Sequence, residues 1–144
     1  MKRDLVIVGA GPAGMAAAAQ AAELGLSVTV LDEQLRAGGQ IYRDVDRASP
    51  SRGNILGADY TTGRRLTEGL CQSGVEHISG AVVWAIEDEF CISYTCEGRG
   101  AQIEADRILL ATGALERPMP IPGWTLPGVM TAGAGQILLK QSGV

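Results

Sequence analysis

The sequence is poor in the residue types that nucleic-acid-binding proteins use. Aromatic residues make up only 4% of its 144 residues, and 12 Lys and Arg are outnumbered by 16 Asp and Glu, so the net charge is −4. Recognition of nucleic acid relies on a basic surface, often interleaved with aromatic side chains. No basic stripe of this kind is present in the sequence, and nucleic-acid binding is not expected.

Cysteine and histidine are also scarce. The three cysteines, Cys71, Cys91 and Cys96, form no CxxC pair, and their odd number argues against a fully paired disulfide framework. A reducing compartment is therefore expected, and the cytoplasm is the predicted location. The single histidine, His77, lies in a strand-like run, where a surface or structural role is favoured over that of a catalytic base. The sequence contains no metal-ligand cluster, so no metal is expected.

Long uninterrupted apolar runs are missing as well. The Ala-rich stretch that follows Lys2 and Arg3 is interrupted by Asp4 and ends at Gln20 and Glu23. A membrane-spanning helix needs ~20 nearly continuous apolar residues. A secretory signal needs an unbroken apolar centre, which the glycines of this stretch break up. Neither a membrane segment nor a leader peptide is expected.

Glycine, with 20 residues, and hydrophobic residues, at 46%, are abundant. This composition suits an α/β protein with tight connections, and the length fits a single domain over residues 1–144. Residues 4–9 and 27–31 are short apolar runs typical of buried parallel strands. The Ala-rich residues 12–24 between them predict a helix that ends at Gly25. Together they predict a right-handed βαβ unit.

The rest of the chain is predicted to add helices and a small antiparallel β-meander to the parallel sheet. Residues 34–57 are expected to be irregular, because Gly-Gly and Ser-Pro-Ser sequences punctuate them. Prolines between residues 118 and 127 exclude a helix or a central strand there. The remaining elements are predicted from their apolar patterns: helices over 59–73 and 131–141, hairpin strands over 75–86, 89–95 and 101–104, and a buried strand over 107–111.

The turn between the first strand and the first helix carries the pattern Gly-x-Gly-x-x-Gly, at Gly9, Gly11 and Gly14, with Pro12 and Ala13 between them. The pattern is informative here because a strand precedes it, a helix follows it and an acid lies about 20 residues further on. The first glycine permits a tight turn, the second lets the backbone approach a pyrophosphate, and the third lets the helix pack on the sheet. The helix N-terminus favours phosphates. These features predict a Rossmann-like dinucleotide-binding site.

Two acids follow the second strand. Asp32 is the first choice as the acceptor for the adenosine ribose hydroxyls, and its neighbour Glu33 is a competing candidate. A carboxylate at this point would repel a 2′-phosphate, so NADP is disfavoured. These residues alone leave both FAD and NAD open.

Two further segments favour FAD. The sequence Gly-Gly-Gln at 38–40 follows the acids closely, and Ala-Thr-Gly at 111–113 ends a later strand. Together with the N-terminal pattern, they resemble the FAD half of the two-dinucleotide-domain flavoproteins, the glutathione-reductase-like superfamily. The resemblance implies FAD as the cofactor, with the 38–40 segment near the flavin and the backbone around residue 82 near the adenine. The cofactor-binding residues that it implies are Gly39, Gln40, Val82, Ala111, Thr112 and Gly113.

Longer strings narrow the resemblance. Residues 30–34, 38–43, 113–118 and 121–132 are similar to the FAD-binding α subunits of opine oxidases, hydrogen cyanide synthase and related amine or imino-acid dehydrogenases. The resemblance covers essentially the whole chain. It implies an NAD(P)-related flavoprotein oxidoreductase that passes hydride or electrons between a small amine-type substrate, or a partner subunit, and an acceptor.

The chain departs from this superfamily in two ways. It lacks the redox cysteine pair of the disulfide reductases, which excludes dithiol chemistry for the residues present. It also lacks the second, NAD(P)-binding domain and the late Gly-Asp segment that contacts the flavin. We therefore expect the N-terminal FAD-binding part of such an enzyme, completed by further chain or by a partner subunit, and no catalytic residue is assigned. A non-catalytic dinucleotide-binding or assembly module and an NAD-binding domain remain alternatives.

Overall fold

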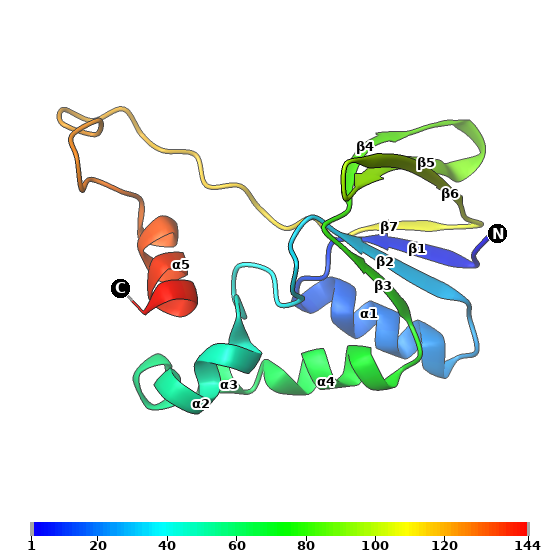
Figure 1. Cartoon of the computed structure of the whole chain (residues 1–144), viewed down its shortest axis with the longest axis horizontal. Helices are drawn as coiled ribbons and strands as arrows, with labels where there is room; N and C mark the ends of the chain where they lie inside the picture. The colour runs from blue at the N-terminus through cyan, green and yellow to red at the C-terminus, as the bar shows by residue number, and fades with distance from the viewer. Residues whose placement is uncertain (1, 144) are drawn as a thin grey trace.

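The computed structural model describes residues 2–143, and Figure 1 shows how their helices and strands are arranged. In chain order the elements are β1 (Leu5–Val8), α1 (Pro12–Glu23), β2 (Val28–Asp32), α2 (Val45–Leu56), α3 (Ala58–Thr61), α4 (Arg64–Gln72), β3 (Glu76–Ser79), β4 (Val82–Ile86), the 3-10 turn η1 (Asp88–Phe90), β5 (Cys91–Cys96), β6 (Arg99–Glu104), β7 (Ile108–Leu110) and α5 (Ala132–Ser142).

Four of the strands form a parallel sheet in the order β3-β2-β1-β7. Helix α1 joins β1 to β2 as predicted, and the register places Leu5 opposite Val28 and Val8 opposite Leu31. All five residues of β2 are buried. Burial on both faces explains why the central strands are almost continuously apolar rather than alternating.

The two faces of the parallel sheet pack against different layers, as Figure 1 shows. Ile7 of β1 packs with Met15 of α1 and Leu70 of α4 in one core cluster. Its neighbour Val6 points to the opposite face and packs with Ile92 of β5 in a second cluster. The sheet is therefore the middle layer, between the helices and a second sheet.

The second sheet is three-stranded and antiparallel, in the order β4-β5-β6. Val82 pairs with Thr95, and Cys91 pairs with Glu104. Strand β6 begins at Arg99, inside the residues that the sequence predicted as a turn. The predicted fold class, a parallel sheet with helices plus a small antiparallel β-meander, is confirmed.

The prediction that residues 34–57 are irregular is wrong, because α2 occupies the second half of this range. Pro50 lies inside the helix, where it removes one backbone hydrogen bond. Tertiary packing compensates for that loss, since Val45 and Ala48 are buried against Tyr60 in a third apolar cluster.

The single helix predicted over 59–73 is divided into α3 and α4 at Thr62 and Gly63. The ring of Tyr42 fills the space next to Gly63, so a side chain there would overlap the ring. The division lets α4 pack on α1 while α3 packs on α2.

The continuous strand predicted over 75–86 is two strands in two different sheets. The chain turns at Gly80, whose φ is +71°. The N–H groups of Gly80 and Ala81 donate to the carbonyl oxygens of Gln34 (3.2 Å) and Asp32 (2.8 Å), respectively. These two bonds attach the start of the antiparallel sheet to the carboxyl end of β2.

After β7 the chain leaves the body of the molecule and returns at α5, drawn in red in Figure 1. The last helix is found where it was predicted, and the Thr131 hydroxyl accepts a hydrogen bond from the N–H of Ala134 at 3.4 Å. Many apolar side chains of residues 114–130 are exposed, led by Leu115 at 96%. No helix within residues 2–143 has the length and apolar character needed to span a membrane.

Candidate dinucleotide-binding site

The loop between β1 and α1 lies at the carboxyl edge of the parallel sheet, where open α/β sheets hold their ligands. Gly9 turns the chain with a φ of +107°, and its N–H donates to the carbonyl oxygen of Leu31 at 2.7 Å. Gly11 is the N-cap of α1, Pro12 follows it, and no side chain caps this helix end. The N–H groups of the first turn therefore face the loop without a side-chain acceptor, an arrangement that suits an anion. Ala13, in the same turn, is exposed.

The three glycines of the loop differ in what surrounds them. A Cβ on Gly14 would overlap the carbonyl oxygen of Gly9, and a Cβ on Gly9 would overlap that of Ala111. By contrast, the nearest atom to a Cβ on Gly11 is the Cα of Gly39, at 4.0 Å. The fold itself therefore requires glycine at positions 9 and 14, whereas at position 11 it leaves open space beside the helix terminus.

The two candidate acids are in different situations. Asp32 is 7% exposed; its Oδ2 accepts a hydrogen bond from the N–H of Ala10, and its Oδ1 accepts one from the N–H of Gln34 at 2.7 Å. Asp32 thus holds the glycine loop to the end of β2. Glu33 is exposed, and its carboxylate receives only a bond from Nε2 of Gln34 at 3.2 Å. The geometry favours the competing candidate, Glu33, as the carboxylate with room for ribose hydroxyls.

The Gly-Gly-Gln segment lies against the first glycine loop. The N–H of Gly38 donates to the carbonyl oxygen of Ala10 at 2.9 Å. Gly39, with a φ of +60°, approaches so closely that a Cβ on it would be 2.9 Å from the Cα of Gly11. Gln40 is exposed at the end of the segment. Two glycine-rich segments separated in the sequence therefore border the same space.

The Ala-Thr-Gly segment follows β7 at the same edge of the sheet. The N–H of Ala111 donates to the carbonyl oxygen of Val8 at 2.8 Å, and the carbonyl of Ala111 lies beside Gly9. Thr112 and Gly113 are exposed beyond it, and Gly113 has a φ of +73°. This third segment borders the loop on the side of β7.

Val82 lies nearby, at the start of β4. Its side chain is 51% exposed, so only the backbone before it contacts β2, through the bond from Ala81 to Asp32. The residues on either side of the acids are therefore brought together, while the Val82 side chain itself points to solvent.

His77 lies in β3, paired with Val30, and is half-buried. Burial lowers the pKa of this imidazole, and the charge of Asp32 partly offsets the effect. Its Nε2 is buried without a hydrogen-bond partner among the described residues. This environment matches the structural role that the sequence favoured. Within residues 2–143, no group of three or more His, Cys, Asp or Glu side chains is arranged to hold a metal ion.

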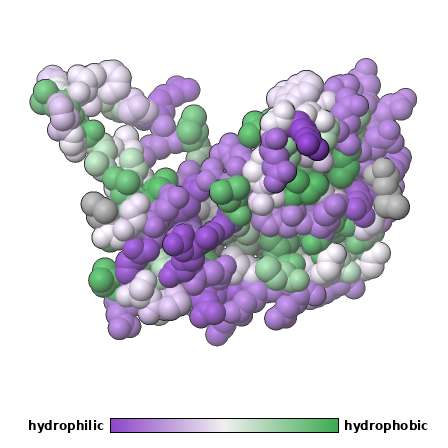
Figure 2. Space-filling view, in the orientation of Figure 1, coloured by the Kyte–Doolittle hydropathy of each residue, from purple (hydrophilic) through white to green (hydrophobic). Residues whose placement is uncertain are grey.

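Sequence reasoning missed a charged cluster beside the Gly-Gly-Gln segment. Arg36 forms an ion pair with the buried Asp44 at 2.6 Å, and Nη1 of Arg43 donates to Oε1 of Gln34. Figure 2 shows the hydrophilic surface, in purple, over this part of the molecule. Asp44 has a φ of +57°, and no sequence pattern predicted this turn. An open hollow beside Arg3 and Leu26 lies at the opposite edge of the sheet, away from these segments.

With this geometry described, comparisons with known proteins identify the family. The family model described as pyridine nucleotide-disulphide oxidoreductase matches residues 3–140. The chain belongs to the pyridine nucleotide-disulphide oxidoreductase family. Membership of this family confirms three predictions: a Rossmann-like nucleotide-binding domain, FAD as the cofactor, and an oxidoreductase family.

Individual relatives narrow the family further. The A-type subunit of opine oxidase from Agrobacterium tumefaciens (strain Ach5) is 51% identical over 148 residues, which cover 97% of this chain and 29% of that protein. The HcnB subunit of hydrogen cyanide synthase from Pseudomonas aeruginosa is 40% identical, over 96% of this chain and 30% of that protein. The predicted resemblance to these proteins is confirmed, and the chain spans less than a third of their length.

A solved structure shows the same fold. L-proline dehydrogenase from P. horikoshii superimposes with a TM-score of 0.79 at 22% sequence identity, over 97% of this chain and 28% of that protein. At this level of identity, the match concerns the fold.

Proposed function

We propose that residues 1–144 are one FAD-binding domain, with the FAD pyrophosphate at the N-terminus of α1 and the adenosine ribose at Glu33. The observation that carries the proposal is the open space at Gly11, where the nearest atom to a Cβ is 4.0 Å away. The neighbouring glycines are required by the fold, so they would be needed with or without a ligand. A close approach of phosphate to the backbone explains a glycine at position 11.

The other candidate residues take roles that follow from their positions. Gly9, Pro12, Ala13 and Gly14 form the turn and the first helical residues that would face the phosphates. Asp32 holds this loop to β2 through the N–H of Ala10. The segments with Gly39 and Gln40, and with Ala111, Thr112 and Gly113, would border the flavin side of the cofactor. The backbone next to Val82 would border the adenine side, beside the acids.

We further propose that the protein oxidises a small amine- or imino-acid-type substrate. When bound, the flavin supplies the acceptor of hydride or electrons, and the residues of this chain bind and orient it. Support comes from the relatives, which are named as opine oxidase and hydrogen cyanide synthase subunits. Their description as subunits also supports a partner protein. Exposed apolar side chains between residues 114 and 130, such as Leu115, are consistent with contact to further polypeptide.

The test is the flavin content of the purified chain. We expect a yellow protein, or an apoprotein that takes up about one FAD per chain on titration and prefers FAD to NAD. The matched control is Gly11→Val, which should fold and take up no FAD. A chain that stays colourless with added FAD, or that prefers NAD, would overturn the proposal.

Amine oxidation is tested separately. Mixing the FAD-loaded protein with candidate amines and imino acids without oxygen should bleach the flavin absorbance. A protein that binds FAD tightly but is never bleached, alone or with a partner protein, would favour the alternative of a non-catalytic dinucleotide-binding module.

A further inference from the structure

Lys140 is a buried charged residue whose ammonium group contacts the Gly-Gly-Gln segment. It lies in the last turn of α5, and only 5% of its surface is exposed. Its Nζ donates to the carbonyl oxygens of Gln40 (3.2 Å) and Ile41 (2.6 Å), and lies 5.4 Å from the centre of the Tyr60 ring. None of the ion pairs among the described residues includes Lys140.

This environment is unfavourable for a side chain that merely fills space. Burial lowers the pKa of the Lys140 ammonium, and the nearby charge of Arg43 lowers it further. An apolar side chain of similar length would fill the same space without desolvating a charge. What the ammonium adds is two charge-assisted hydrogen bonds to backbone carbonyls and a cation–π contact with Tyr60. Its specific effect is therefore to fix the backbone of residues 40 and 41.

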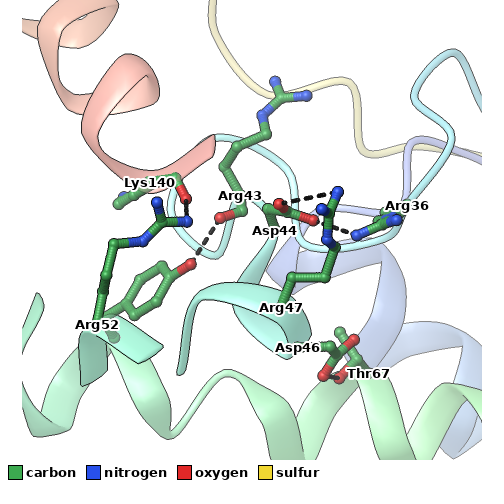
Figure 3. Close-up of polar contacts among 9 residues, drawn as sticks. Arg36, Arg43, Asp44, Asp46, Arg47, Arg52, Thr67 and Lys140 are labelled. Atoms are coloured by element: carbon green, nitrogen blue, oxygen red, sulfur yellow. Dashed lines mark hydrogen bonds and ion pairs between the residues drawn. The ribbon is translucent and has the colours of Figure 1, made fainter. Parts of the chain in front are cut away.

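A second contact runs in the opposite direction. Arg52 of α2 donates from Nη2 to the carbonyl oxygen of Lys140 at 2.9 Å, as Figure 3 shows. This carbonyl belongs to the last turn of α5, where carbonyl groups lack helical partners. The Tyr60 hydroxyl donates to the carbonyl oxygen of Arg43 at 2.7 Å. Helices α2, α3 and α5 therefore all hold the chain that follows Gly-Gly-Gln.

The opposite side of the same segment faces the first glycine loop. Gly38 is bonded to Ala10, and Gly39 lies against Gly11. The N–H of Tyr42 donates to the carbonyl oxygen of Gly38 at 3.0 Å, so residues 38–42 form one compact turn. The turn is thus held between the phosphate-facing loop on one side and the Lys140 ammonium on the other.

We propose that Lys140 is a positioning residue for the dinucleotide site: it holds the 38–42 turn against the Gly11 loop in the arrangement that receives FAD. This inference rests on the proposed function. It assigns to α5, about a hundred residues away in the sequence, a part in a site whose sequence motifs are concentrated near the N-terminus.

The test compares Lys140→Met with Lys2→Met, because the chain contains only these two lysines. Lys2 is an exposed residue paired with Asp106 on the surface, so its replacement controls for the loss of one positive charge. Two quantities are measured in the 144-residue chain: the dissociation constant for FAD, and the amide hydrogen exchange of residues 38–42 without FAD. The second quantity needs no cofactor.

In Lys140→Met, we expect the N–H of Tyr42 to exchange at least about tenfold faster, with unchanged exchange in β1 and β2. We also expect the dissociation constant for FAD to rise about tenfold, as for the loss of hydrogen bonds from a charged donor. Lys2→Met should match the unaltered chain in both. Arg52→Gln, which loosens α5 without touching the ammonium, should shift both quantities in the same direction and serves if Lys140→Met fails to fold.

Unchanged exchange over residues 38–42 in Lys140→Met would overturn the inference. Faster exchange with an unchanged FAD dissociation constant would also overturn it, since the turn would then be held for another reason. If the unaltered chain binds no FAD, the proposed function fails, and the positioning role fails with it. The exchange data would still show whether Lys140 restrains the turn.

Discussion

Separate alanine substitutions at Gly11 and Gly14 should have opposite consequences for stability and for binding. A Cβ at position 14 would overlap the carbonyl oxygen of Gly9, so α1 must move away from β1. Forcing extra volume into a packed core costs about 1–3 kcal/mol, which exceeds the ~1 kcal/mol that alanine gains over glycine within a helix. We therefore expect Gly14→Ala to be destabilised by about 1–2 kcal/mol, a loss of roughly 2–8 °C in Tm.

At Gly11 the nearest atom to a Cβ is 4.0 Å away, and the backbone φ of −74° is compatible with alanine. The unfolding free energy of Gly11→Ala should therefore stay within about 1 kcal/mol of the unaltered chain. Its added methyl group would occupy the approach of the pyrophosphate, so the dissociation constant for FAD should rise by roughly a hundredfold, equivalent to ~3 kcal/mol. Thermal unfolding by circular dichroism and FAD titration measure the two effects. If Gly11→Ala binds FAD as tightly as the unaltered chain, the pyrophosphate assignment is refuted.

Three further predictions follow from polar groups near the strands. Asp32→Asn should lower Tm, because one of its two backbone donors then faces an NH₂ group, at a cost of about 1–3 kcal/mol; Glu33→Gln should leave Tm unchanged and weaken FAD binding, and the reverse pattern would restore Asp32 as the ribose acceptor. The pKa of His77 is lowered by burial, so its stabilising contribution is present above about pH 6.5 and is lost as the pH falls further; the Tm of His77→Gln should therefore fall less between about pH 7 and about pH 5. Hydrogen bonds from the hydroxyl and N–H of Ser27 lower the pKa of Asp4, so this contribution is lost as the pH falls below about 4, and Asp4→Asn should remove that part of the acid sensitivity of Tm.

The first βαβ unit could be predicted from the sequence because its signals are local. The apolar runs at 4–9 and 27–31 and the Ala-rich helix between them depend on neighbouring residues, and the structure reproduces them as β1, α1 and β2. Helix α2 could not be predicted, because Pro50 argues against a helix and its compensation comes from Tyr60, on another helix. Local propensity is a weak guide wherever tertiary contacts decide.

The candidate site shows the same division. The sequence identified the three segments that the structure brings to one edge of the sheet, because each carries its own glycine pattern. It could not rank Asp32 against Glu33, since both are acids in adjacent positions. The ranking depends on the N–H of Ala10, which bonds to a residue 22 positions away. The contact from Lys140 to Gln40, across 100 positions, left no signal in either segment.

The structure also changes which glycine of the motif indicates a ligand. Gly9 and Gly14 would be retained in any protein with this close packing of α1 on β1, because their Cβ positions are filled by backbone atoms of the chain itself. The fold places no such demand on Gly11, for which alanine fits both the space and the backbone angles. A Gly-x-Gly-x-x-Gly motif therefore combines two constraints from folding with one from binding. In this chain the argument for a bound dinucleotide rests on the second glycine and on the second glycine segment, Gly38-Gly39, that lies against it.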